Sequence, residues 1–199
     1  MKIAVIGSGI SGLSAAYYLS KKFKVDLFER EDYFGGHSYT YDIKNQKKTI
    51  PVDLGFIVFN ELTYPNLLNF FKELEVPFEK SDMSFAVSIQ GSNIEYGGRG
   101  LKAIFANKSN IFNFNFVKMI IEIISFYKNA PLLIKNNLDG ETLGSYLDKS
   151  NFSKYLVEYH IIPMVAAIWS MPFSKAKEIP LKLFLNFFIN HGLFKLRNR

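Results

Sequence analysis

The chain has 199 residues, 48% of them hydrophobic and 21% charged, which is typical of a globular protein with a buried core and excludes a mainly disordered chain. It contains no cysteine, so disulfides, thiolate metal sites and a cysteine nucleophile are excluded within this sequence. The net charge is +6, but the lysines are scattered and form no basic stripe with interleaved aromatic residues, so we do not expect nucleic acid binding.

An uncharged stretch runs from residue 3 to residue 20. A signal peptide or a short membrane span would fit its length, but three glycines and four serines argue against both. The stretch is better explained by a buried strand over residues 2–6, a glycine-rich turn and a helix that ends near residue 21. A second strand over residues 24–28 completes a strand, turn, helix, strand unit.

The glycine-rich turn contains a G-x-G-x-x-G motif formed by Gly7, Gly9 and Gly12. The first glycine permits a tight turn, the second leaves room for a pyrophosphate, and the third lets the helix approach the strand closely. Backbone N–H groups at the start of the helix would face the phosphates, with the hydroxyls of Ser8 and Ser11 as additional donors. The turn therefore predicts a dinucleotide site.

An acidic residue, Glu29, ends the second predicted strand 20 positions after Gly9. At this position a carboxylate accepts hydrogen bonds from the ribose of a bound dinucleotide, and it disfavours a 2′-phosphate. Arg30 makes that exclusion incomplete. The alternative for Glu29 is a solvated charge at the end of a strand. The motif by itself does not distinguish NAD from FAD.

A glycine doublet at positions 35 and 36 follows the acid, and the sequence Val-Asp-Leu-Gly follows at positions 52–55. Here the chain resembles the flavin amine oxidase superfamily, which includes protoporphyrinogen oxidases and carotenoid desaturases. Together with the segments 55–61, 64–66, 81–85 and 167–170, it resembles a bacterial branch of proteins described as NAD/FAD-binding. A plain turn between two strands is the alternative explanation of the doublet.

The family pattern is a glycine doublet, then an arginine, then a hydroxyl residue. Thr40 matches the hydroxyl position, whereas His37 replaces the arginine and Tyr33 stands where a second arginine is common. The resemblance implies that the doublet lies against the pyrophosphate of FAD and that residues 55–57 run past the flavin. The predicted cofactor-binding residues are Gly7, Ser8, Gly9, Ser11, Gly12, Glu29, Arg30, Gly35, Gly36, His37, Gly55, Phe56 and Ile57.

The rest of the sequence predicts a further strand from Val52 into Phe59, then mostly helices. The further predicted elements are a helix over about 64–74, a hairpin over 85–96, a turn at 97–100 that opens a helix, and helices over about 111–130, 152–171 with a break at Pro163, and 181–191. Lys118, Glu122 and Lys128 interrupt the 111–130 helix, which is too short to span a bilayer. It could cap a substrate cavity or lie on a membrane surface, and we favour the cap because its polar face is not strongly cationic.

No catalytic residue can be named from the sequence. The three histidines lack metal-ligand spacing, so no metal site is predicted, and a G-x-S-x-G motif is absent. His160 and Trp169 could line a cavity, although a buried tryptophan is ordinarily packing.

The sequence thus predicts an α/β fold with a Rossmann-like βαβ start over residues 1–60, which binds FAD, and an α+β, mostly helical substrate or cap domain over residues 61–199. Because only a few strands are available, we expect the sheet to be incomplete and the chain to be the N-terminal part of a longer protein. Residues 1–199 alone are then expected to aggregate or to bind FAD weakly.

The resemblance implies an FAD-dependent oxidoreductase that transfers a hydride to flavin from a C–H bond of an amine or a lipophilic small molecule. An NAD-dependent dehydrogenase and a non-catalytic nucleotide-binding module are the alternatives. A cytoplasmic location fits the absence of cysteine, with peripheral membrane contact as an alternative. The sequence does not specify the oligomeric state.

Overall fold

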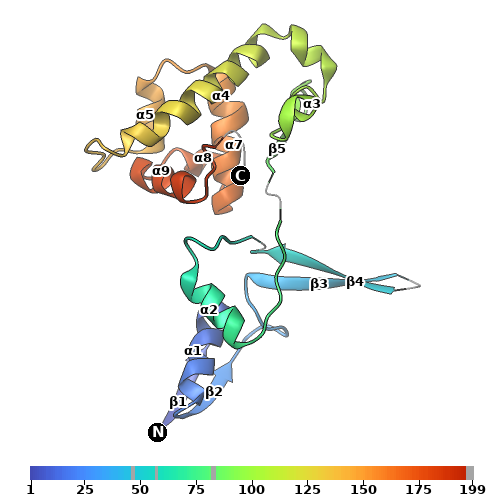
Figure 1. The fold of residues 1–199 in the computed structure, drawn as a ribbon, viewed down its shortest axis with the longest axis vertical. Coiled ribbons are helices and arrows are strands. Elements are labelled where there is room, and N and C mark those ends of the chain that lie inside the picture. The colour runs from blue at the N-terminus through green and yellow to red at the C-terminus, as the bar shows by residue number, and fades with distance from the viewer. Residues whose placement is uncertain (46–47, 57, 82–83, 196–199) are drawn as a thin grey trace. The chain divides into compact units, whose positions relative to one another are not determined.

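The computed structural model describes residues 1–45, 48–56, 58–81 and 84–195. The chain divides into two compact units, Met1–Glu79 and Lys80–Arg199, which are blue to teal and green to red in Figure 1. None of the helices in the described part of the chain combines the length and the apolar character that crossing a bilayer requires.

The first unit begins with β1 (Lys2–Ile6), α1 (Ile10–Ser20) and β2 (Lys24–Phe28), as the sequence predicts. The two strands pair in parallel, with Lys2 opposite Lys24 and Ile6 opposite Phe28. Two parallel strands joined by a crossover through a helix are the unit from which dinucleotide-binding domains are built. Only two strands form this sheet in the described residues, which agrees with the predicted incomplete sheet.

A long hairpin follows, made of β3 (Ser38–Asn45) and β4 (Lys48–Gly55) paired antiparallel. The predicted strand from Val52 into Phe59 is therefore wrong beyond Gly55, and its first half does not join the parallel sheet. The ladder ends at Gly55 because the backbone turns there, with φ at 77°. The N–H of Phe56 then donates to the carbonyl of His37 at 3.1 Å.

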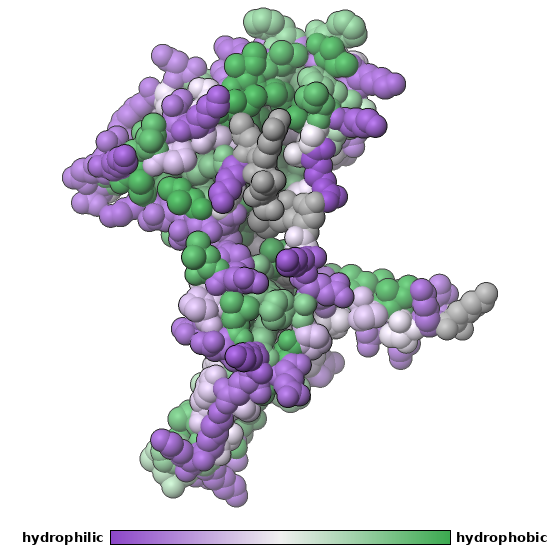
Figure 2. Space-filling view, viewed as in Figure 1, coloured by the Kyte–Doolittle hydropathy of each residue, from purple (hydrophilic) through white to green (hydrophobic). Residues whose placement is uncertain are grey.

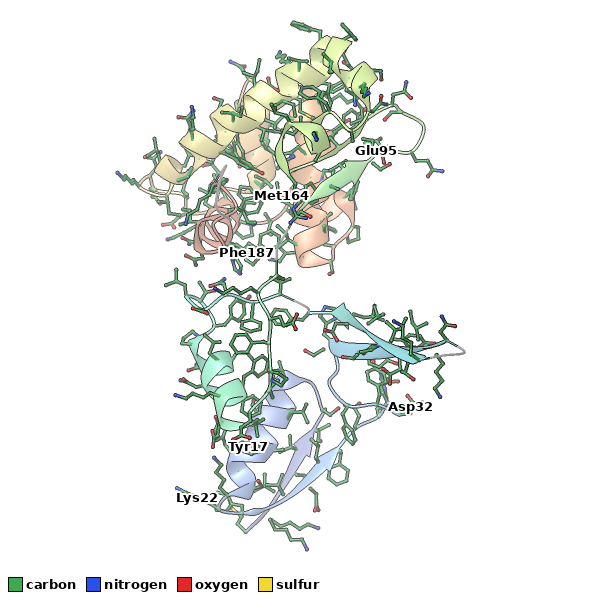
Figure 3. All side chains as sticks on the ribbon, turned by 45° about the vertical axis from the view of Figure 1, so that its right-hand side comes forward. Tyr17, Lys22, Asp32, Glu95, Met164 and Phe187 are labelled. Atoms are coloured by element: carbon green, nitrogen blue, oxygen red, sulfur yellow. The ribbon has the colours of Figure 1, made fainter. Side chains whose placement is uncertain are left out.

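The predicted helix near residue 64 is confirmed as α2 (Pro65–Glu73), with Pro65 in the first turn, where its missing N–H costs no hydrogen bond. It packs on α1. The ring centroid of Phe70 lies 5.6 Å from that of Tyr17 and 5.8 Å from that of Tyr18. Figure 3 shows Tyr17 where α1 and α2 meet. The first compact unit consequently extends past residue 60.

The second unit opens with the predicted hairpin, here β5 (Ala86–Ser88) and β6 (Glu95–Gly97). The predicted glycine-rich turn opens α3 (Gly100–Ile104), and a 3₁₀ turn, η1 (Lys108–Phe112), comes next. Hydrophilic side chains alternate with apolar patches on the visible surface (Figure 2).

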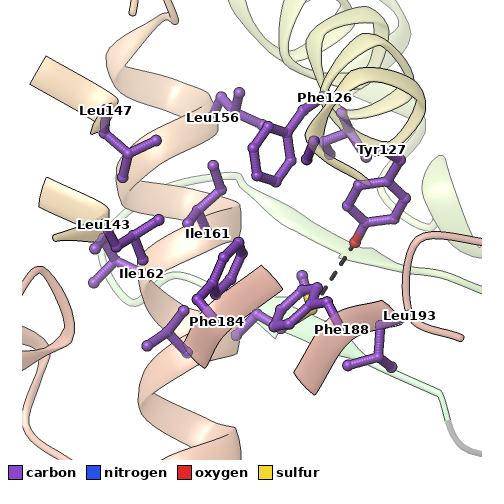
Figure 4. Packing of buried hydrophobic residues seen from close by; sticks show 14 of the residues in the cluster. Phe126, Tyr127, Leu143, Leu147, Leu156, Ile161, Ile162, Phe184, Phe188 and Leu193 are labelled. Atoms are coloured by element: carbon purple, nitrogen blue, oxygen red, sulfur yellow. Dashed lines mark hydrogen bonds between the residues drawn. The ribbon is translucent and has the colours of Figure 1, made fainter. Parts of the chain in front are cut away.

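Helices make up the rest of the second unit. They are α4 (Phe114–Leu133), α5 (Leu143–Lys149), α6 (Lys154–Leu156), the π-helical turn η2 (Val157–Ile161), α7 (Ile162–Trp169), α8 (Phe173–Ala176) and α9 (Leu181–Asn190). The three predicted helical regions are thus found, whereas α5 was not predicted. Apolar side chains from α4, α6 and α9 meet in one core, including the fully buried Phe126, Leu156 and Phe184 (Figure 4).

The predicted break at Pro163 is wrong, since α6, η2 and α7 follow one another without an interruption. Proline has no N–H for the carbonyl four residues earlier, which belongs to Tyr159. That carbonyl instead accepts a hydrogen bond from the Tyr96 hydroxyl of β6, at 2.8 Å. The chain adjusts to the proline by a π turn rather than by ending the helix.

Candidate functional site

The turn between β1 and α1 requires glycine at two of its three motif positions. Gly7 has φ at 91°, and its N–H donates to the carbonyl of Phe28 at 2.7 Å. A Cβ at Gly12 would lie 1.8 Å from the carbonyl oxygen of Gly7, so α1 meets the end of β1 more closely than any side chain allows. These two glycines are needed for the fold itself.

The middle glycine, Gly9, is different. A Cβ built there meets no atom within 4 Å, and its backbone, at φ −65° and ψ 175°, suits any residue. Gly9 precedes the first residue of α1, where unpaired N–H groups and the helix dipole favour an anion. The fold therefore leaves an open space in front of the start of α1.

The glycine doublet closes on this turn. The N–H of Gly35 donates to the carbonyl of Ser8 at 2.9 Å, and Gly9 and Gly35 form an isolated parallel bridge. Gly36 lies so near that a Cβ there would come within 3.0 Å of the Cα of Gly9. A plain turn between strands does not require such an approach. The two glycine segments therefore form adjacent walls of one site.

Glu29 lies beside the same turn and is held by four donors. Its Oε2 accepts from the N–H and the hydroxyl of Ser8 at 2.7 and 2.5 Å, and its Oε1 accepts from the N–H groups of Arg30 and Glu31 at 2.7 and 3.0 Å. These bonds, the Ser8 hydroxyl first among them, lower the pKa of Glu29 from 4.5 to about 2. The carboxylate is therefore ionised at neutral pH.

The Ser8 hydroxyl gives its single proton to Glu29, whereas the sequence prediction directed it toward a phosphate. This bond links the glycine turn to the acid that follows β2. Ser8 is fully buried, so the contact is part of the packed structure rather than a surface encounter. The sequence spacing placed both residues at the site but gave no sign of the bond between them.

The other predicted residues make different contacts. Ser11 is exposed in the first turn of α1. The Arg30 guanidinium is exposed and pairs with Glu31, with its Nε 2.8 Å from the carboxylate. His37 is exposed in the turn before β3, and Phe56 contacts the ring of Tyr64 at 5.9 Å. Ile57 lies outside the described residues.

Thr40, which matches the family pattern, donates to the carboxylate of Asp53 across the hairpin at 2.7 Å. The two residues are directly opposite in the antiparallel register. This bond gives the hydroxyl residue of the pattern a structural role in holding β3 to β4.

A buried polar cluster in the second unit, here called the His160 cluster, was not predicted. It consists of His160, Tyr96 and Tyr127. The hydroxyl of Tyr96 lies 2.8 Å from Nδ1 of His160, and the hydroxyl of Tyr127 lies 2.9 Å from Nε2. All three side chains are buried, and burial raises the pKa of Tyr96, which keeps its hydroxyl protonated. His160 is therefore a buried side chain whose two ring nitrogens both lie within hydrogen-bond distance of a tyrosine hydroxyl.

Replacing Glu29 by Gln is expected to weaken dinucleotide binding by roughly ten- to a hundred-fold, because a charge-assisted hydrogen bond to the ribose is lost. Isothermal titration with FAD measures the change. Glu31→Gln is the matched control, since Glu31 accepts from the exposed Arg30 side chain and is expected to bind FAD as the parent does.

A stability measurement separates this effect from a damaged turn. The lowered pKa of Glu29 means that its ionised form stabilises the fold above about pH 4.5 and that this contribution is lost as the pH falls toward about 2. We expect the Gln variant to lose less stability over that interval than the parent does. Equal FAD affinity in the two proteins would show that the carboxylate does not contact the ribose.

Comparison with known proteins identifies the first unit. Residues 5–74 match the family model of the NAD(P)-binding Rossmann-like domain. This range begins within β1 and ends just after α2, so it agrees with the extent of the first compact unit rather than with an end at residue 60.

Three relatives align with longer parts of the chain. Prenylcysteine oxidase 1 of Rattus norvegicus is 26% identical over 209 aligned positions, covering 89% of this chain and 39% of the relative. Protoporphyrinogen oxidase of Dictyostelium discoideum is 30% identical over 151 positions, covering 67% and 28%. The 1-hydroxycarotenoid 3,4-desaturase of Flavobacterium sp. (strain P99-3) is 37% identical over 82 positions, covering 39% and 15%. The chain therefore spans well under half the length of these relatives.

Proposed function

This chain belongs to the flavin amine oxidase-like superfamily, and we propose that it supplies the dinucleotide site of an FAD-dependent oxidoreductase. Two of the three relatives are oxidases by name and the third is a desaturase, so all three names describe the removal of electrons from an organic substrate. FAD, when bound, accepts a hydride from a C–H bond and passes the electrons on. The protein's part is to bind and orient it.

The observation that carries this proposal is the contact between the two glycine segments. Gly9 leaves space at the start of α1, and Gly35 and Gly36 close the other side of that space. In the proposed complex the N–H groups of the helix start donate to the pyrophosphate, and the ionised Glu29 accepts from the ribose. A dehydrogenase that binds NAD through the first motif alone would leave the glycine doublet without a role.

The substrate is proposed to be lipophilic, such as a hydrophobic amine, a polyene or a fatty-acyl compound. The second unit offers an apolar groove of about 600 Å³ beside β5 and α7, and a second of about 520 Å³ beside η2 and α8. The first groove is lined mainly by apolar side chains, including Phe85, Val87, Ala166, Met171 and Phe173. Neither His160 nor Trp169 is among the lining residues of these two grooves.

We expect the full-length protein to purify yellow and to release FAD on denaturation, because this chain would supply two walls of the proposed pyrophosphate site. Absorbance between the near ultraviolet and the blue, followed by chromatography of the released nucleotide, makes the measurement. A colourless protein that binds NAD would contradict the proposal and favour a dehydrogenase. Tight FAD binding without turnover of any lipophilic substrate would favour a non-catalytic module.

A further inference from the structure

The hairpin of β3 and β4 has two chemically different faces. Residues that are opposite in the antiparallel register share a face, and side chains alternate between the faces along each strand. One face consists of three apolar pairs, which are Tyr39 with Leu54, Tyr41 with Val52 and Ile43 with Ile50. The other face consists of the pairs Thr40 with Asp53, Asp42 with Pro51 and Lys44 with Thr49. The ring of Tyr33 extends the apolar face, with its centroid 4.5 Å from that of Tyr39.

Tyr33 and the three apolar pairs are here called the Tyr41 face, and most of this face is exposed to solvent. The exposed fractions are 53% for Tyr41, 46% for Ile43, 45% for Leu54, and 37% for Tyr33 and for Ile50. In Figure 1 the two strands extend as a ribbon beyond α1, α2 and the parallel strands. A two-stranded hairpin alone in water is marginally stable, and a contiguous exposed apolar surface marks an interaction site.

The tip of the hairpin is basic. The sequence places Lys44, Lys47 and Lys48 there and contains no acidic residue between positions 43 and 52. Lys48 is on the same face as Ile50, because the two residues are two positions apart on β4. The Tyr41 face therefore ends in a positive charge at the tip.

The base of the hairpin is acidic. Asp32 is exposed and directly precedes Tyr33, whose ring lies at the base end of the Tyr41 face. Arg30 and Glu31 in the same turn pair with each other, so their charges compensate. Asp53 also lies near the base, on the opposite face of the hairpin. The two ends of the Tyr41 face thus carry opposite charges.

We propose that the Tyr41 face is a homodimer interface, in which the hairpins of two copies of the chain pack face to face about a two-fold axis. Two-fold symmetry brings the same apolar face of each copy together. Twisted sheets pack face to face in this way at a distance of about 10 Å.

The charges select the direction of the two hairpins. If the hairpins run antiparallel, the basic tip of each lies over the acidic base of the other, and Lys48 pairs with the partner's Asp32. If both tips lay at the same end, lysines would face lysines. The proposed dimer is therefore antiparallel, with two symmetric charge pairs that flank an apolar centre.

The area of the Tyr41 face fits a weak dimer. A large side chain buries about 150 to 250 Å², so the five exposed fractions given above leave roughly 400 Å² of apolar surface in each copy. Two copies would bury about 800 Å² of this surface, and interfaces below about 1,200 Å² belong to weak complexes. We therefore expect an equilibrium between monomer and dimer that depends on concentration, rather than a permanent dimer.

Sedimentation velocity of the whole chain over about 1 to 100 μM tests the proposal. We expect the sedimentation coefficient to rise from that of a monomer to that of a dimer and no further, because a two-fold interface closes on itself. Ile50→Lys and Tyr41→Lys are each expected to raise the dimer Kd at least about tenfold, since every dimer would bury the new charge twice. Thr49→Lys is the matched control, because it adds the same charge beside Ile50 on the opposite face and should leave the Kd within about twofold.

An exchange of the end charges tests the antiparallel arrangement. Lys48→Glu alone and Asp32→Lys alone are each expected to raise the Kd about five- to tenfold, because each creates two like-charge contacts in every dimer. The double variant Lys48→Glu, Asp32→Lys should return to within about twofold of the parent. Unspecific aggregation would not show this rescue.

Circular dichroism checks that each variant is folded. The proposal is overturned by a chain that stays monomeric at every concentration, which would leave the Tyr41 face to another segment of a longer polypeptide. It is also overturned by association that persists unchanged in both Ile50→Lys and Tyr41→Lys, which would identify another surface as the contact. Failure of the double charge variant to restore the dimer would contradict the antiparallel arrangement.

Discussion

Gly9→Val is expected to reduce FAD binding by roughly a hundred-fold or more while leaving the protein folded, because the branched side chain would fill the space proposed for the pyrophosphate. The structure predicts that the fold tolerates this change. A Cβ at Gly9 meets no atom within 4 Å, and the extended backbone there suits a β-branched residue. Titration with FAD and a thermal melt of the same sample measure the two effects.

Gly12→Ala is the matched control, because the third glycine of the motif has the opposite environment. A Cβ at this position would lie 1.8 Å from the carbonyl oxygen of Gly7, and that oxygen belongs to backbone that cannot easily move. We expect this variant to lose about 3 kcal/mol or more of stability and to bind FAD poorly for that reason. If Gly9→Val binds FAD as the parent does, the pyrophosphate does not lie at the start of α1.

The strands and helices of the first unit could be predicted closely because their signals are local. The bounds of β1 and β2 agree with the prediction, since a short apolar strand, a glycine turn and a helix follow one another in a fixed spacing. The helix α2 was predicted from its apolar face and from Pro77 after its end. The hairpin of β5 and β6 followed from alternation interrupted by a Gly-Ser-Asn turn.

Contacts between distant residues could not be predicted in the same way. The bond from Ser8 to Glu29 and the bridge from Gly9 to Gly35 depend on how three segments meet, which no spacing in the sequence specifies. The same limit explains why the strand predicted from Val52 into Phe59 was wrong after Gly55. A run of β-branched and aromatic residues suggested a continuing strand, but the partner strand begins at Ser38, so pairing ends at Gly55.

The helix around Pro163 shows this limit most clearly. Proline predicts a break because the carbonyl of Tyr159 loses its intrahelical donor. The replacement donor, Tyr96, is 63 residues away along the chain, on β6. Only the assembled core supplies it, so the sequence rule was correct about the lost bond and wrong about its consequence.

Tyr96→Phe is expected to lower the free energy of unfolding of the second unit by about 2 to 4 kcal/mol, because a buried ring nitrogen and a partly buried carbonyl each lose a hydrogen bond. The Tyr96 hydroxyl has one proton, which it donates to the carbonyl of Tyr159. Nδ1 of His160 must then be the donor toward Tyr96. Nε2 lies 2.9 Å from the Tyr127 hydroxyl, which also lies 3.9 Å from Sδ of Met164 as a donor. The substitution therefore removes one hydrogen bond from the carbonyl of Tyr159 and one from the imidazole of His160.

Urea denaturation monitored by tryptophan fluorescence measures this change. The signal reports on the second unit, because the single tryptophan of the chain, Trp169, packs on Phe187 in α9. Tyr127→Phe removes the hydroxyl beside Nε2 of His160 and leaves both contacts of the Tyr96 hydroxyl in place, so a smaller loss of about 1 to 2 kcal/mol is expected. Tyr155→Phe is the control, since Tyr155 is only half-buried and contacts Tyr159 through its ring, and its effect should stay within about 0.5 kcal/mol. Equal stabilities of Tyr96→Phe and Tyr155→Phe would show that the His160 cluster does not hold the helix through Pro163, and that the π turn alone accommodates the proline.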